Sequence, residues 1–173
     1  MNFFNVNARE HRKPAYPTQR QVKMTPGFVW VQSSGGEKVV GAVEGGSEPG
    51  GMYVGRALHQ NDLVPGKVHC THRVLYLPWG HREHGKQQYE VLIADVNARY
   101  DWIPSSNGQV PPRAIQGGYT STGEVLYIGR KVHKGVLIPG KVHSYTASEN
   151  VIVAPRDGKF QTLIKKFDYF HQV

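Results

Sequence analysis

The chain of 173 residues contains a single cysteine, Cys70, and no run of about eighteen apolar residues. One cysteine excludes an intrachain disulfide, and with it the disulfide-stapled scaffolds of small secreted proteins. The missing apolar run argues against a membrane-spanning helix, and the first residues lack the continuous apolar core of a signal peptide. We therefore expect a soluble protein made in the cytoplasm, with release by an unconventional route left open.

Signatures of catalysis are also missing. We find no nucleophile elbow, no phosphate-binding loop and no distinctive pair of catalytic carboxylates, so we expect no enzymatic activity and no cofactor. His81 and His84 in the stretch HREH are three residues apart and flanked by glycines, whereas metal-binding helices place histidines four apart. We interpret HREH as a solvated loop without a metal, and Cys70 as a small buried apolar residue.

Basic residues outnumber acidic ones, and the net charge is +8, but no run of five or more Lys or Arg occurs. Such a charge attracts nucleic acid, anionic membranes or sulfated glycans. Without a basic run, a stacking platform or a recognised motif, we expect no specific nucleic-acid binding. An interaction protein that binds anionic partners, in a salt-sensitive way, remains an alternative function.

The chain does contain an internal repeat. YVGRALHQNDLVPGKVH begins at Tyr53 and YIGRKVHKGVLIPGKVH at Tyr127, 74 residues later, with 10 of 17 positions identical. Related phrases surround both copies in the same order, so each copy is one structural unit. We divide the chain into an N-terminal arm (1–24), a first repeat (25–97) and a second repeat (98–173), and expect the two repeats to share one fold.

The periodicity within each copy is that of β-strands. FVWV, VLYL, YEVLIA and NVIVA are short and rich in β-branched and aromatic residues, and clusters of Ser, Asn and Gly separate them. No segment keeps an apolar stripe at helical spacing over three turns. The sequence therefore predicts an all-β protein made of antiparallel strands in two related, sandwich-like modules.

Pro-Gly-Lys occurs in both copies, in LVPGKV (63–68) and LIPGKV (137–142). Proline followed by glycine favours a type II turn, which would leave Lys67 and Lys141 on a fixed rim at the start of the next strand. Arg56 and Arg130 end the YVGR and YIGR phrases. For these arginines a structural ion pair is favoured over contact with a ligand.

Two copies of W…GG…YxGRxxH…PGKV…YEVL resemble the DM-nine repeat family, over Phe28 to about Phe170. The resemblance implies a two-repeat β fold in which the repeats exchange strands about a pseudo-twofold axis. The small members of that family are mannose-binding lectins that act as pattern-recognition proteins of innate immunity and tend to form dimers. This chain is thus expected to be a homodimeric, agglutinating or pattern-recognition lectin that binds mannose-type glycans on microbial or cell surfaces.

In such lectins the sugar is held by the lysine of the Pro-Gly-Lys phrase and by an aspartate in the loop after a Gly-Gly pair. The resemblance assigns the lysine role to Lys67 and Lys141. No aspartate follows either Gly-Gly pair, so a scaffold that has lost sugar binding is a further alternative. The candidate ligand-binding residues in those loops are Ser47, Glu48, Tyr119 and Thr120. A carboxylate and an ammonium suit vicinal hydroxyls, and Tyr119 could cover a sugar ring, whereas Trp30 and Trp102 look like core residues.

Overall fold

The computed structural model describes residues 25–105 and 109–143 in full, and the strands at 152–153, 162–163 and 167–172 by their backbone. The N-terminal arm lies outside the described residues. The strands are β1 (Phe28–Ser34), β2 (Met52–His59), β3 (Asp62–His69), β4 (Val74–Trp79), β5 (Arg82–Lys86), β6 (Gln88–Ala94), β7 (Tyr100–Ser105), β8 (Gln116–Tyr119), β9 (Val125–His133), β10 (Val136–His143), β11 (Ile152–Val153), β12 (Thr162–Leu163) and β13 (Phe167–Gln172). Within these residues there is no helix that could cross a membrane.

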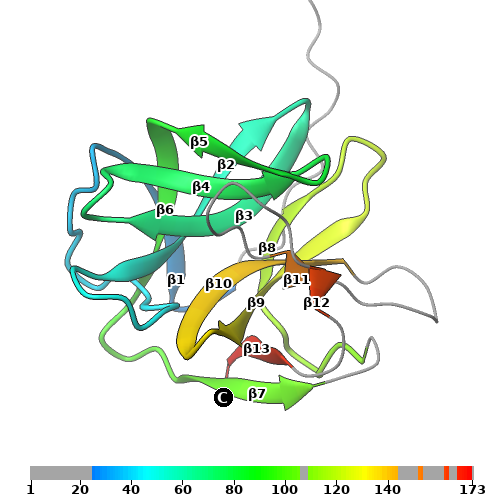
Figure 1. Ribbon diagram of the computed structural model, residues 1–173. Helices are drawn as coiled ribbons and strands as arrows, with labels where there is room; N and C mark the ends of the chain where they lie inside the picture. The colour runs from blue at the N-terminus through cyan, green and yellow to red at the C-terminus, as the bar shows by residue number, and fades with distance from the viewer. Residues whose placement is uncertain (1–24, 106–108, 144–151, 154–161, 164–166, 173) are drawn as a thin grey trace, which may run out of the picture.

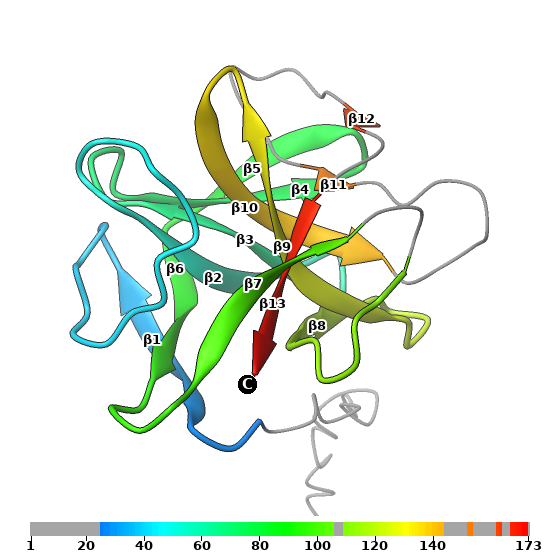
Figure 2. The ribbon, with the colours of Figure 1, turned by 90° about the horizontal axis from the view of Figure 1, so that it is seen from below.

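The strands form one continuous antiparallel network in place of two separate sandwich-like modules. Its main path runs β1-β6-β2-β3-β8-β9-β10-β11-β12, while β4 and β5 branch from β3, and β13 joins β7 to β9. The two repeats meet where Leu63 of β3 pairs with Tyr119 of β8. Strand β10 also packs against β3, as Figures 1 and 2 show from two directions. The predicted all-β, antiparallel class is confirmed.

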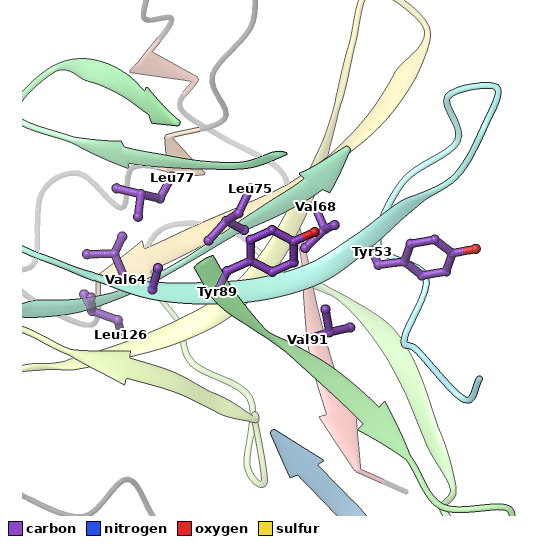
Figure 3. Packing of buried hydrophobic residues seen from close by; sticks show 9 residues of the cluster. Tyr53, Val64, Val68, Leu75, Leu77, Tyr89, Val91 and Leu126 are labelled. Carbon is purple, nitrogen blue, oxygen red and sulfur yellow. The ribbon is translucent and has the colours of Figure 1, made fainter. Parts of the chain in front are cut away.

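The hydrophobic core draws on both repeats. Tyr89 and Leu75 lie at the centre of one cluster, to which the second repeat adds Leu126, and Figure 3 shows their side chains gathered around β3 and β6. The buried hydroxyl of Tyr89 accepts a hydrogen bond from the Gly36 amide at 2.9 Å, so this large side chain leaves no unsatisfied polar atom in the cluster. Two further clusters also contain residues of both repeats. In one of them, Ile115 and Ile128 of the second repeat pack with Phe28, Val43, Val54 and Leu92 of the first. In the other, Met52 of the first repeat packs with Ile138 and Val142 of the second.

The prediction that each Pro-Gly-Lys phrase forms a turn is wrong. The hairpin between β2 and β3 turns at Gln60 and Asn61, whose φ angles of 52° and 67° fit a two-residue turn of the type that matches strand twist. Pro65 therefore lies inside β3. Proline is tolerated there because of the side of β3 that faces away from β2. On that side β3 pairs with β8 at Leu63 and with β4 only from Lys67 onward, so neither strand needs an amide hydrogen from Pro65.

Two smaller expectations also need correction. HREH is not a loop, because Gly80 and His81 form a tight turn at φ 54° and 58° and Arg82–Lys86 is strand β5. His84 lies in that strand and hydrogen-bonds to the Trp79 carbonyl at 3.1 Å. Cys70 is only partly buried and packs at the edge of the Tyr89 cluster.

Candidate ligand site at two buried lysines

Lys67 and Lys141 lie in the middle of the repeated strands β3 and β10, and their exposed fractions are 5% and 7%. They are therefore buried strand residues, and the expectation that they project from a turn is wrong. Burying an ammonium group is costly unless nearby groups compensate its charge. Two such lysines at equivalent positions indicate that each has a polar environment built for it.

Glu83 of β5 compensates the charge of Lys67. Its Oε1 atom lies 3.5 Å from the Lys67 Nζ atom, and the two side chains are 13% and 6% exposed. Tyr76, the residue paired with Lys67 across β3 and β4, places its ring 5.4 Å from the same Nζ atom. Burial, and then the Glu83 charge, raise the pKa of the Tyr76 hydroxyl. The hairpin β4–β5 thus covers the first lysine with a carboxylate and an aromatic ring.

Glu48 reaches the same face of β3 through His69, which is two residues beyond Lys67 and so points to the same side. The Glu48 Oε2 atom is 2.7 Å from His69 Nε2. The other ring nitrogen of His69 accepts a hydrogen bond from the His72 amide at 3.3 Å, so Nε2 carries the proton that His69 donates to Glu48. The His72 ring stacks on the His69 ring at 3.7 Å.

Ser47 holds the loop before Glu48 to the second repeat. Its amide donates to the Leu137 carbonyl at 3.2 Å, and its hydroxyl accepts from the Leu137 amide at 3.0 Å. Both polar groups of Ser47 thus bind the backbone of β10, which gives this residue a structural task.

Lys141 has a different environment. Burial lowers the pKa of Lys141, and the negative charge of Asp62 opposes that shift. Asp62 comes from the first repeat, at the start of β3, next to the hairpin turn. Across residues 25–105 and 109–143, no hydrogen bond from the Lys141 ammonium group is found and no carboxylate lies within 4.0 Å of its Nζ atom.

His143 lies two residues beyond Lys141 and shares its face of β10. Burial, and then the charge of Lys141, lower the pKa of His143 from 6.5 to about 4, while Asp62 acts in the opposite direction. Glu124 places its Oε2 atom 3.9 Å from His143 Nδ1. The second lysine is therefore surrounded by groups from β10, from the β8–β9 loop and from the first repeat.

Thr120 orders that β8–β9 loop. Its hydroxyl accepts from the Glu124 amide at 3.0 Å and hydrogen-bonds to Thr122 at 2.9 Å, and its own amide donates to the Glu124 carbonyl. Thr120 thus acts on the Lys141 environment through Glu124. Tyr119 pairs with Leu63 of β3 and with Val125 of β9, and its charge acts on Arg56.

The repeated arginines have structural partners. Arg56 binds Glu90 at 2.6 Å and stacks on Trp30, 4.0 Å from the ring centroid. Arg130 stacks in the same way on Trp102 at 4.2 Å. Both tryptophans pack against the core, in agreement with their interpretation as core residues.

Sequence reasoning missed Asp62, Glu83 and His143. For His143 a signal existed, because KVH occurs in both copies and a residue two positions from a lysine shares its strand face. For Asp62 there was none, because the equivalent position in the second copy is Val136. Glu83 was assigned to a loop. Among the fully described residues, no group of three or more His, Cys, Asp or Glu could hold a metal ion.

The sequence pattern of the DM9 repeat matches residues 50–159, more than half of the chain. The chain belongs to the DM9 repeat family. Both YxGRxxH and PGKVH phrases of this DM9 protein, and both buried lysines, fall inside the matched range.

A solved structure of similar fold is the nematode sperm cell motility protein MFP2B, with a TM-score of 0.63 and 15% sequence identity. The similarity covers 94% of this DM9 chain but 50% of that protein, so the chain spans about half of its length. At this identity the match indicates the fold alone. Among curated proteins, no sequence matches this chain.

Proposed function

We propose that this DM9 protein binds carbohydrate, as a lectin for mannose-type glycans on microbial or cell surfaces. Some members of the DM9 family bind carbohydrate, which supports the class of function. The observation that carries the proposal is that each repeat buries a strand lysine at the same position: Lys67 lies 3.5 Å from the Glu83 carboxylate, and the negative charge of Asp62 acts on Lys141.

This pairing suits a neutral sugar. Vicinal hydroxyls donate to carboxylate oxygens and accept from an ammonium group, so one acidic and one basic side chain can satisfy both without a net charge on the ligand. Binding through one such site is expected to be weak. A dimer that presents several sites to a repetitive glycan surface would gain avidity without new contacts.

The test is retention of the full-length protein on a glycan array and on mannose–agarose. The double variant Lys67→Met/Lys141→Met removes both charges and keeps apolar stems of similar length. We expect it to lose retention, because no ammonium remains to donate to the sugar. Lys38→Met, at an exposed position, is the control for loss of positive charge and should bind like the wild type. Normal retention of the double variant would refute the proposal.

The second candidate function is binding to anionic partners, and the net charge of +8 favours it. In that case retention would follow sulfated glycans or acidic vesicles, would ignore mannose and would fall steeply as salt is raised. Lys38→Met would then weaken binding as much as a single substitution at Lys67 or Lys141. A folded protein that retains no ligand on either support would indicate a scaffold that has lost sugar binding.

A further inference from the structure

Two histidine side chains from different hairpins of the first repeat lie against each other. His59 is the last residue of β2, and His84 lies in β5, opposite Leu77 of β4. Their ring centroids are 4.2 Å apart, and the ring planes are tilted by 38°. Trp79 lies edge-on to both rings, with centroid distances of 5.1 Å and 6.2 Å. Both imidazoles are partly exposed, so an ion from solvent can reach them.

The hydrogen bonds of these rings leave nitrogen lone pairs available. His84 Nε2 lies 3.1 Å from the Trp79 carbonyl oxygen, which can only accept, so Nε2 carries the proton and Nδ1 of the neutral ring keeps its lone pair. Among residues 25–105 and 109–143, no hydrogen bond to either ring nitrogen of His59 or to Nδ1 of His84 is found. Histidines that bind a metal typically donate their other N–H to a carbonyl or carboxylate, which fixes the ring. His84 already has this arrangement.

His59 is held in the form that binds a metal ion. Burial, and then the positive charges of His84 and Lys86, lower the pKa of His59 from 6.5, while the charge of Asp62 opposes the shift. The His59 ring is therefore neutral at pH 7. A neutral imidazole can offer a nitrogen lone pair, whereas a protonated one cannot.

The other pair of adjacent histidines in this repeat is arranged differently. The rings of His69 and His72 are stacked with an angle of 8° between their planes, so their in-plane lone pairs cannot meet at one ion. Glu48 and the His72 amide engage both nitrogens of His69, and Nδ1 of His72 bonds to the Tyr76 hydroxyl. That pair is a closed hydrogen-bonded group, whereas the tilted pair of His59 and His84 is open to a ligand.

We propose that His59 and His84 together bind one divalent transition-metal ion of the kind that imidazole ligates, Zn²⁺, Cu²⁺ or Ni²⁺, with water completing its coordination. Metal–nitrogen bonds of about 2.0–2.1 Å hold two ligating nitrogens about 3 Å apart. Small side-chain rotations reach that separation from tilted rings with centroids at 4.2 Å. No group of three candidate ligands occurs among the fully described residues, so this site is weaker than a structural or catalytic zinc centre. Ca²⁺ and Mg²⁺ take oxygen ligands and are expected not to bind.

The ion would join two hairpins. His59 belongs to the β2–β3 hairpin, and β5 pairs with β4 alone among the described strands, so the metal ties this outer strand to β2. A ligand that binds only the folded chain stabilises it by mass action. The sequence contains no histidine between His143 and His171, so the second repeat has no counterpart of His84, and we expect one ion per chain.

Trp79 reports on the site, because paramagnetic Ni²⁺ broadens the NMR signals of nearby groups. Trp79 contacts both histidine rings, whereas Trp30 and Trp102 stack on Arg56 and Arg130. In the ¹⁵N-labelled full-length protein at pH 7, we expect substoichiometric Ni²⁺ to broaden the Trp79 indole signal first. Excess Zn²⁺, which is diamagnetic, should restore that signal by competition, and Mg²⁺ should have no effect.

Three variants then test which residues bind the ion. His59→Gln and His84→Gln are each expected to weaken Ni²⁺ binding, measured by isothermal titration calorimetry, by at least about tenfold, which corresponds to about 1.4 kcal/mol. His81→Asn is the matched control, because it removes a histidine from the same HREH phrase and asparagine tolerates the φ of 58° at that position. Its affinity should stay within about twofold of the wild type.

His59→Gln decides the matter if His84→Gln unfolds, since no hydrogen bond of the His59 ring is found among the described residues. The inference is overturned if the wild type binds neither Ni²⁺ nor Zn²⁺, or if His59→Gln keeps the wild-type affinity. It is also overturned if His81→Asn loses as much affinity as the other two variants, or if Ni²⁺ broadens all three indole signals equally.

Discussion

Gly118 lies against the main chain of Leu63 in the other repeat, so closely that a Cβ atom added to Gly118 would overlap the Leu63 carbonyl oxygen. The same relation recurs in the opposite direction, because a Cβ on Gly46 would lie 2.5 Å from the Leu137 carbonyl oxygen. In each repeat the Gly-Gly pair thus allows a close approach of the strand that carries Pro-Gly-Lys in the other repeat. This contact fixes the backbone at the start of the loop that follows each Gly-Gly pair.

Gly118→Ala is expected to destabilise the protein strongly. The overlap is with backbone, so no side-chain rotation can relieve it, and a forced shift of packed strands typically costs about 1–3 kcal/mol. Urea unfolding measures the loss. Gly85→Ala is the matched control, because its Cβ would meet only the Val74 methyl group at 3.3 Å and its backbone is ordinary β. Equal stabilities of the two variants would contradict the interpretation.

Arg56 is expected to contribute to stability through geometry as well as charge. Its guanidinium binds Glu90 at 2.6 Å, donates to the Gly117 carbonyl at 3.4 Å and stacks on Trp30. Lysine keeps the positive charge but lacks the planar guanidinium that makes these hydrogen bonds and stacks on the ring. Arg56→Lys should therefore lower the free energy of unfolding by about 1–2 kcal/mol. Arg56→Met leaves Glu90 without its cation and should cost about 2–3 kcal/mol, less than a fully buried pair because Glu90 is 25% exposed.

A double-mutant cycle separates these contributions. Adding Glu90→Gln to Arg56→Met removes the uncompensated carboxylate, so the double variant should be more stable than the sum of the two single losses predicts. Unfolding in urea gives all four stabilities. An Arg56→Lys variant as stable as the wild type would show that charge alone matters.

The strands could be predicted from sequence because their apolar, β-branched runs follow a simple period, and FVWV, VLYL and YEVLI all fall in strands. The error in predicting a turn at Pro-Gly-Lys could not be recognised from the sequence. Its local chemistry favours a turn, and only the positions of β4 and β8 along β3 explain why Pro65 is accepted in a strand. Asp62 acts on Lys141 from the other repeat, and no local sequence pattern encodes the pairing of β3 with β8 that joins the two repeats.

Stability should fall as the pH is lowered from about 6.5 to about 4, partly because of His143. Its pKa is 6.5 in the unfolded chain and about 4 in the folded protein, so in this window the unfolded state binds a proton that the folded state does not. The contribution is present above pH 6.5 and is lost as the pH falls to 4. We expect a loss of about 2 kcal/mol, less than the full shift implies because the side chain is 32% exposed.

Urea unfolding of the wild type and His143→Gln at pH 7 and pH 4.5 tests this contribution. The variant should lose less stability on acidification than the wild type. Lys141→Met should also flatten the profile, since removal of the neighbouring positive charge lets the pKa of His143 rise towards 6.5. Identical pH profiles of wild type and His143→Gln would contradict the assignment.

Lys134→Asn should stabilise the protein without affecting the lysine sites. Lys134 and Gly135 form the two-residue turn between β9 and β10 at φ 48° and 81°, and a side chain such as lysine tolerates that conformation poorly. Asn-Gly is the preferred sequence for this turn, so the substitution is expected to gain about 0.5–1 kcal/mol and raise the thermal midpoint. Lys134→Ala removes the same exposed charge without the turn preference and should not be stabilised. If Lys134→Ala gained as much as Lys134→Asn, relief of positive charge and not turn geometry would be the cause.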